Sequence, residues 1–347
     1  MKYLLNFFDE HQPRRIKVIE NTLTNRRTVS NMFWAQQYGL LNWTGANRSL
    51  DREQFEHDLQ GLVDQGLLQL ADHQARLTSM GVVQQEALRE QCYWPSFYSW
   101  YWLGNVNKIE ERLLLAVQVV SELSHHQRRY VPVSDSPYQL RWIRNWLYRE
   151  VHRDPQMAQS LLRELLIVGE SLASQDQRAA ELFSYLLVGF ESTGWTLADA
   201  GQQLGTEPIE TEFIKTDVML AVGAYAANRH GLLQRLLTDL LKKSPLSSSV
   251  ERTMALFKRG TDVAMIAKVR QLKVNTVREH LLDAAIIEPD SYPWLTIIPK
   301  AVQELLADRY ADQLVSDWQY AGDPNDNEQF FYFRLYQIIK GGQHGSR

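Results

Sequence analysis

The sequence predicts an all-α protein of three parts: an N-terminal winged-helix-like domain, a central helical domain and a C-terminal helix-turn-helix domain. Three observations support this prediction. Apolar residues recur with the period of amphipathic helices through most of the 347 residues. Between residues 84 and 240 there is no convincing two-residue alternation, the pattern of half-buried strands. From Ser249 to Ile287 the apolar spacing is that of three helices around one small core.

Local composition sets the expected domain boundaries. The winged-helix-like domain covers residues 1–85, the helical domain residues 86–243, and the helix-turn-helix domain residues 244–340. The segment Leu241 to Ser249 is the clearest linker, because a proline and clustered serines sustain neither helical nor strand periodicity. Residues 341–347 are glycine-rich and polar, and we expect them to form a disordered tail.

The N-terminal part has the order helix, helix, helix and hairpin, which is typical of a winged helix. We expect Asp51 to cap a helix that runs to about Gln65, with Gln54 in the position that a capping box uses. Gly66 then ends this helix. Two short apolar pieces around the polar turn Asp72–Gln74 indicate a small hairpin.

Charge is unevenly distributed along the chain, whose formal net charge is −4. Residues 11–48 carry six Lys or Arg against one acid, and residues 251–282 carry seven against three. Residues 151–212 carry three Arg against ten acids, so two basic segments flank an acidic middle. The overall balance excludes a protein that coats nucleic acid with its whole surface, since such binding requires many neutralised phosphates. A secondary basic patch is formed by Arg14, Arg15, Lys17, Arg26 and Arg27.

The central domain begins with a dense group of aromatic residues. This group has no basic residue among its members, so we expect it to fill a helical core rather than to stack on nucleic-acid bases. Its members are Tyr93, Trp94, Phe97, Tyr98, Trp100, Tyr101 and Trp102.

Residues 193–222 have the spacing of a second, degenerate helix-turn-helix. The helix that would read DNA opens with Glu207, Glu210 and Glu212, and these carboxylates would repel phosphates. We therefore expect this segment to be a structural module or a protein-contact surface.

The C-terminal helix-turn-helix has the apolar register that such a fold requires. Thr261 is expected to cap the second helix, and the small Ala267 lets the third helix approach it closely. Leu272 fills the turn from within, and His280 is expected to be partly buried where it closes the core. This register specifies the fold more firmly than the ligand, because some helix-turn-helix folds bind only protein.

The third helix carries the residues that we expect to contact DNA. Asn275 and Arg278 can pair bidentately with adenine and guanine, and Lys268 and Arg270 beside the turn would contact phosphates. Lys273 stands where a serine usually caps the third helix, which places a positive charge at the positive helix end. The alternative is an ordinary solvated face. The predicted DNA-binding residues are Lys268, Arg270, Lys273, Val274, Asn275 and Arg278.

Two resemblances to known families add to this interpretation. The register from Ser249 to Ile287, with residues 299–306 and the aromatic run 330–335, resembles the helicase-associated helix-turn-helix domain at the C-terminus of many RecQ-type helicases. Further segments are similar to the YpbB-type proteins of Gram-positive bacteria, whose genes neighbour a RecQ helicase gene: residues 25–28, 38–41, 128–132 and 139–142. The resemblance implies a DNA-linked accessory protein and no known reaction.

No motif of an enzyme with recognisable spacing occurs in the chain. Walker-type phosphate loops, dinucleotide-binding glycine motifs, zinc-binding His-Glu-x-x-His and nucleophile elbows are all absent from the sequence. We therefore expect a protein that is not an enzyme, with no catalytic residue, no cofactor and no metal site. No window approaches the ~20 apolar residues of a membrane-spanning helix, and the N-terminal apolar stretch is too short for a signal peptide. We expect a cytoplasmic protein without membrane contact.

These observations lead to three hypotheses about function. The first is a non-enzymatic DNA-binding accessory protein that acts with a RecQ-type helicase in DNA repair or recombination; DNA and such a helicase are then the partners. The second is a helix-turn-helix transcription regulator. The third is a protein-interaction scaffold whose helix-turn-helix units bind protein. The sequence leaves the oligomeric state and the DNA preference open.

Overall fold

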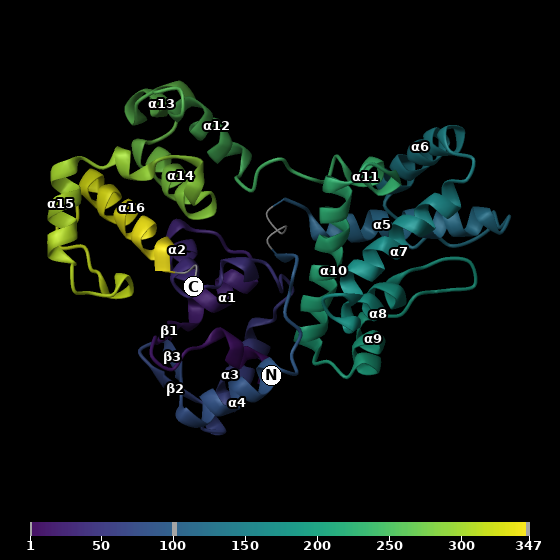
Figure 1. The fold of residues 1–347 in the computed structure, drawn as a ribbon, viewed down its shortest axis with the longest axis horizontal. Helices are drawn as coiled ribbons and strands as arrows, with labels where there is room; N and C mark the ends of the chain where they lie inside the picture. Colours follow the sequence, from purple (N-terminus) through teal and green to yellow (C-terminus); the bar gives the residue numbers. More distant parts are fainter. Residues whose placement is uncertain (1, 99–102, 345–347) are drawn as a thin grey trace. The chain divides into compact units, whose positions relative to one another are not determined.

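The computed structural model describes residues 2–98 and 103–344 (Figure 1). The chain is mostly helical and has three short strands in the described part, so the expected all-α class is corrected by a small β component. It divides into two compact units. The first unit comprises Met1–Pro13 and Gly45–Lys243, and the second comprises Arg14–Thr44 and Ser244–Arg347. Residues 1–85, expected as one winged-helix-like domain, thus contribute to both units.

In the part that the structure describes, the first unit contains the short 3₁₀ helix η1, a β-hairpin and a set of α-helices. In chain order its elements are η1 (Lys2–Phe7), α3 (Arg52–Asp64), β2 (Leu68–Ala71), β3 (Gln74–Leu77), α4 (Ser79–Arg89), α5 (Val106–Ser124), α6 (Pro137–Arg153), α7 (Met157–Ala173), α8 (Gln177–Leu186), α9 (Leu197–Leu204), α10 (Pro208–Asn228) and α11 (Leu232–Leu237). None of the described helices of the chain is both long and apolar enough to cross a membrane.

The segment from α3 to β3 forms as its local sequence predicts. The Asp51 carboxylate accepts a hydrogen bond from the Gln54 amide at 2.8 Å, which satisfies one of the free amides at the start of α3. Strands β2 and β3 pair antiparallel, with Leu68 opposite Leu77. Asp72 and His73 connect them with positive φ angles of 48° and 61°, the backbone of a tight hairpin turn.

Helix α10 is the central helix of the first unit. Its buried residues lie on all sides, and it contacts α5, α7, α8, α9 and α11. The expected helix-turn-helix spacing at 193–222 is present as α9 and α10, joined through Gly205 in the left-handed conformation. Glu210 is only 7% exposed and accepts hydrogen bonds from the Tyr93 amide and from Arg178, so this residue does not belong to a reading face.

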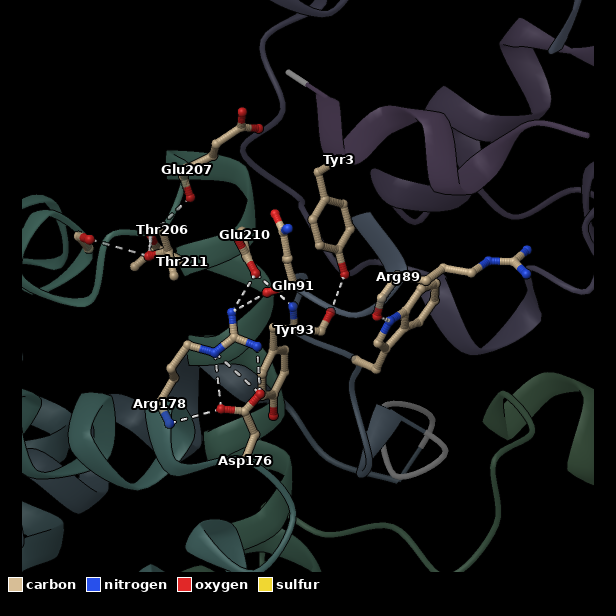
Figure 2. A network of polar contacts seen from close by, with 12 residues as sticks. Tyr3, Arg89, Gln91, Tyr93, Asp176, Arg178, Thr206, Glu207, Glu210 and Thr211 are labelled. Carbon is tan, nitrogen blue, oxygen red and sulfur yellow. Dashed lines mark hydrogen bonds and ion pairs between the residues drawn. The ribbon is translucent and has the colours of Figure 1, made fainter. Parts of the chain in front are cut away.

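Buried polar contacts fix the N-terminal segment and the aromatic run to this helix. The Glu210 carboxylate on α10 accepts a hydrogen bond from the Tyr93 backbone amide at 2.6 Å (Figure 2). The Asp217 carboxylate accepts hydrogen bonds from the Tyr93 hydroxyl at 2.5 Å and from two backbone amides, of Ser96 and Phe97. The Tyr3 hydroxyl donates to the Tyr93 carbonyl at 2.6 Å. Burial raises the pKa of Asp217 above its ordinary value, and the hydrogen bonds from Tyr93, Ser96 and Phe97 offset only part of this rise.

The aromatic run is partly core, as the sequence predicts. Tyr93 and Tyr98 are 1% and 3% exposed, whereas Trp94 lies largely at the surface. Trp100, Tyr101 and Trp102 lie outside the described residues.

The second unit joins an N-terminal segment to the C-terminal part of the chain. Its elements are β1 (Arg14–Arg15), α1 (Ile16–Leu23), α2 (Val29–Gln37), η2 (Leu41–Trp43), α12 (Ser248–Phe257), α13 (Val263–Arg270), α14 (Val274–Ile287), η4 (Pro289–Ser291), η5 (Trp294–Ile297), α15 (Lys300–Arg309), η6 (Val315–Asp317) and α16 (Asn327–His344). Helix α2 packs on α14 and α16, and α16 packs on α14. A disordered tail was expected at 341–347, but α16 continues to His344 and Gly341 is buried. Residues 345–347 lie outside the described part.

Candidate nucleic-acid interface

Helices α12, α13 and α14 form the predicted helix-turn-helix. Ile266, Ala267 and Val277 are buried together, and Leu272 packs against them from the turn, as the apolar register requires. Helix α14 contacts both α12 and α13. The second helix therefore supports the third, which leaves the N-terminal turn of α14 at the surface.

The caps of α13 differ from the prediction at one position. Asp262, rather than Thr261, caps the helix, and its carboxylate accepts from the Met265 amide at 2.8 Å. Gln271 ends the helix in the left-handed conformation, with φ of 54°. The turn to α14 is therefore short and fixed at both ends.

The start of α14 has no side-chain cap. Lys273 occupies the N-cap position and makes no capping hydrogen bond, because its ammonium group has no atom that accepts a hydrogen bond from a backbone amide. The first backbone amides of α14 therefore point outward at the positive end of the helix dipole, without a side-chain acceptor from the N-cap. This is a geometry that binds phosphate.

Four of the six predicted DNA-binding residues are exposed, one on α13 and three at the start of α14. They are Lys268, Lys273, Val274 and Asn275. The side chains of the two lysines form no hydrogen bond or ion pair with the described part of the chain. Two cations, an amide and a small apolar side chain therefore face solvent together.

Arg270 points instead into the fold. Its guanidinium donates to the Ser249 carbonyl at 2.7 Å, to the Ser249 hydroxyl at 3.0 Å and to the Thr253 hydroxyl. Burial and, to a smaller extent, the nearby Arg252 lower the pKa of Arg270. These contacts attach α13 to α12, so Arg270 serves the fold in this structure.

His280 completes the same cluster. Its Nδ1 lies 2.8 Å from the Thr253 hydroxyl, and its side chain is partly buried, as the sequence predicts. Burial and then the Arg270 charge lower the pKa of His280. The sequence did not identify Ser249 and Thr253 as the residues that accept hydrogen bonds from Arg270, because this pairing depends on how α12 crosses α13.

Arg278 lies at the edge of the exposed face. Its side chain is 17% exposed and its Nη2 lies 3.8 Å from the Glu328 carboxylate on α16. Its Nη1 donates to the Asn275 side-chain oxygen at 3.2 Å. Asn275 and Arg278, the two predicted base-reading residues, therefore contact each other, and Arg278 is also attracted to Glu328 of the same chain.

The predicted secondary basic patch lies in the same unit as this helix-turn-helix. Arg14 and Arg15 lie over the rings of Tyr38 and Trp34, at 5.4 and 4.2 Å from the ring centres. The other three members differ: Lys17 pairs with Glu20 at 2.7 Å, Arg27 donates to the Asn25 side chain at 2.9 Å, and Arg26 is exposed. The segment was expected in another domain, and the packing of α2 on α14 places it here.

An apolar strip adjoins the candidate interface. Met265 and Val269 lie one turn apart on α13 and are 46% and 61% exposed, and Val274 is 38% exposed. The prediction of DNA-binding residues included only Val274 of these three. Their spacings of four and five residues were visible in the sequence, but their exposure depends on which face of α13 packs in the core.

Comparisons with known proteins agree with this description. A family model described as a helix-turn-helix domain matches residues 249–316. Protein YpbB of Bacillus subtilis (strain 168) is 28% identical over 221 residues, which is 62% of this chain and 60% of that protein. No solved structure matches the chain. The chain is thus homologous to Protein YpbB and carries a helix-turn-helix domain in its C-terminal part.

Proposed function

We propose that this protein is a non-enzymatic DNA-binding accessory factor that acts with a RecQ-type helicase in DNA repair or recombination. The single observation that supports it most is the uncapped start of α14, where Lys273 and Asn275 surround free backbone amides. The helicase partner is supported by the resemblance of the C-terminal domain to helicase-associated helix-turn-helix domains.

Direct binding assays test the DNA part of this proposal. Duplex, forked and single-stranded probes are titrated at low salt with the full chain and with the double variant Lys273→Ala/Asn275→Ala. We expect the variant to lose most of the affinity for duplex and forked DNA, and we expect forks to be preferred over duplex. Strong selection of one palindromic sequence over random DNA would instead favour a transcription regulator.

A second candidate function is supported by the apolar strip of Met265, Val269 and Val274. Exposed apolar side chains grouped on one face are typical of a protein contact. The triple variant Met265→Ser/Val269→Thr/Val274→Thr separates the two functions. The variant is tested for binding of a RecQ-type helicase and for affinity to duplex DNA. If it no longer binds the helicase but keeps its duplex affinity, the helix-turn-helix binds protein through α13. If only its duplex affinity falls, the strip contacts DNA.

A further inference from the structure

A basic and aromatic face on α6, in the first unit, has no role in the interface described above. Residues with 3.6-period spacing cover the outer side of this helix: Tyr138, Arg141, Arg144, Asn145, Tyr148, Arg149 and His152, all of them exposed. The opposite side, with Gln139, Ile143, Trp146 and Glu150, is buried. The helix thus has one packed face and one open face.

The open face carries cations without compensating acids. Glu150, the acid of α6, is 2% exposed and is bound by Arg153 and Arg235 at 3.1 and 2.9 Å. The side chains of Arg141, Arg144 and Arg149 form no ion pair or hydrogen bond with the described part of the chain. Three arginine side chains therefore remain available to an anionic partner.

Aromatic rings alternate with these cations. Tyr138 and Tyr148 are 63% and 70% exposed, which is unusual for large rings. The His152 ring lies 4.5 Å from the Tyr148 ring, and its Nδ1 lies 2.6 Å from the Tyr148 carbonyl, so the two side chains support each other. Exposed rings among arginines offer stacking surfaces beside phosphate contacts.

A hollow of about 370 Å³ lies on this face, lined by Trp142, Asn145, Tyr148 and Arg149. The Trp142 indole is held in place by the buried Arg112, whose guanidinium carbon is 4.0 Å from the ring centre. Arg112 also pairs with Asp239 and donates to Gln139 at 3.1 Å, which fixes α6 to α5. The hollow therefore offers two rings, an amide and a cation on a rigid support.

We propose that this face of α6 binds single-stranded nucleic acid, with the bases stacked on Tyr148 and Trp142 and the phosphates bound by Arg141, Arg144 and Arg149. Unpaired bases are required because duplex DNA keeps its base faces inside the stack, where these rings cannot reach them. The site is separate from α14, so it neither requires nor implies DNA binding by the helix-turn-helix.

The test is fluorescence anisotropy of a labelled oligo(dT) of about 20 nucleotides, longer than typical single-strand sites of roughly 4–16 nucleotides. The full chain is compared with Tyr148→Ala, Tyr148→Phe and the double variant Arg144→Ala/Arg149→Ala. We expect Tyr148→Ala to bind about tenfold more weakly, the scale of one lost base stack, and Tyr148→Phe to bind like the parent. The double arginine variant should reduce the slope of log affinity against log salt by about 1.4, since each single-strand phosphate contact contributes about 0.7.

Two controls keep the outcomes distinct. Arg52→Ala/Arg76→Ala removes two exposed arginines elsewhere in the same unit and should leave oligo(dT) binding unchanged. Introduced into the Lys273→Ala/Asn275→Ala background, Tyr148→Ala should weaken oligo(dT) binding by the same factor as in the parent, so the two proposals fail independently. If Tyr148→Ala and Arg144→Ala/Arg149→Ala bind oligo(dT) like the parent, or if the control pair weakens binding equally, the proposal is overturned, and an acidic protein segment becomes the better partner.

Discussion

The guanidinium of Arg278 on α14 lies 3.8 Å from the carboxylate of Glu328 at the start of α16. The Tyr332 hydroxyl holds this carboxylate through a 2.9 Å hydrogen bond. Glu328 is 58% exposed and lies beside the face that we propose for DNA, so it competes with phosphate for Arg278.

Removal of that carboxylate should strengthen DNA binding. In Glu328→Gln, Arg278 loses its internal partner and a nearby negative charge disappears, so we expect duplex affinity to rise about three- to tenfold at low salt. The matched control is Glu304→Gln, an exposed acid on α15. If both variants gain equally, the effect comes from net charge and not from Arg278. Anisotropy of a labelled duplex is the measurement.

Lys268 and Arg270 should separate into a binding residue and a structural residue. Arg270→Ala leaves the Thr253 hydroxyl and the Ser249 carbonyl without their donor, so we expect it to lower the free energy of unfolding by about 1–3 kcal/mol. Lys268→Ala should leave stability unchanged and lower the duplex salt slope by about 0.9. Urea unfolding and a salt series measure the two effects. A stable Arg270→Ala that loses only DNA affinity would show that Arg270 contacts phosphate.

Because of Asp283 on α14, the second unit should be less stable at neutral pH than at about pH 4. Burial raises the pKa of Asp283 to about 6, and Arg27 lowers it only partly. The folded state therefore binds this proton more tightly than the unfolded state, whose Asp pKa is about 3.9. Its contribution to stability is present below about pH 4 and is lost as pH rises through about 6.

Asp283→Asn tests this pH dependence. At pH 7.5 we expect the free energy of unfolding of the variant, measured by urea titration, to exceed that of the parent by about 1–2 kcal/mol. At pH 4 the two proteins should be equally stable. Asp290→Asn, at an exposed position near the end of the same helix, is the control and should show neither effect. Equal stability of Asp283→Asn and the parent at pH 7.5 would mean that the carboxylate is solvated.

Tyr93→Phe should weaken the first unit. The substitution removes the hydroxyl that donates to Asp217 and leaves that buried carboxylate with two backbone donors. We expect a loss of about 1–3 kcal/mol in the free energy of unfolding. Hydrogen exchange should quicken in α10 and stay unchanged in α14, which belongs to the other unit. Equal acceleration in both helices would mean that the two units unfold together.

Local features of the fold could be predicted from the sequence. The Asp51 cap, the hairpin from Leu68 to Leu77 and the apolar core around Val277 each depend on residues a few positions apart, and the structure has all three. The uncapped Lys273 belongs to the same class, because the lack of a capping side chain is a property of one position.

Tertiary relationships could not be predicted in this way. The inward turn of Arg270 depends on Ser249 and Thr253, which reach it only when α12 crosses α13. The placement of Arg14–Thr44 with the C-terminal part depends on α2 packing on α14, for which neither segment carries a local signal. The open face of α6 is the exception, because its arginines and tyrosines show their spacing in the sequence, while their exposure required the structure.

The most direct test of the central claim is duplex binding by Lys273→Glu, compared with Lys300→Glu at the exposed start of α15 in the same unit. Anisotropy of a labelled duplex is followed across a salt series with both variants and the parent. The account predicts that Lys273→Glu loses at least tenfold in affinity at low salt and has a slope shallower by about 0.9, while Lys300→Glu binds like the parent. Equal affinities and slopes for the two variants would contradict the proposal that the start of α14 binds DNA.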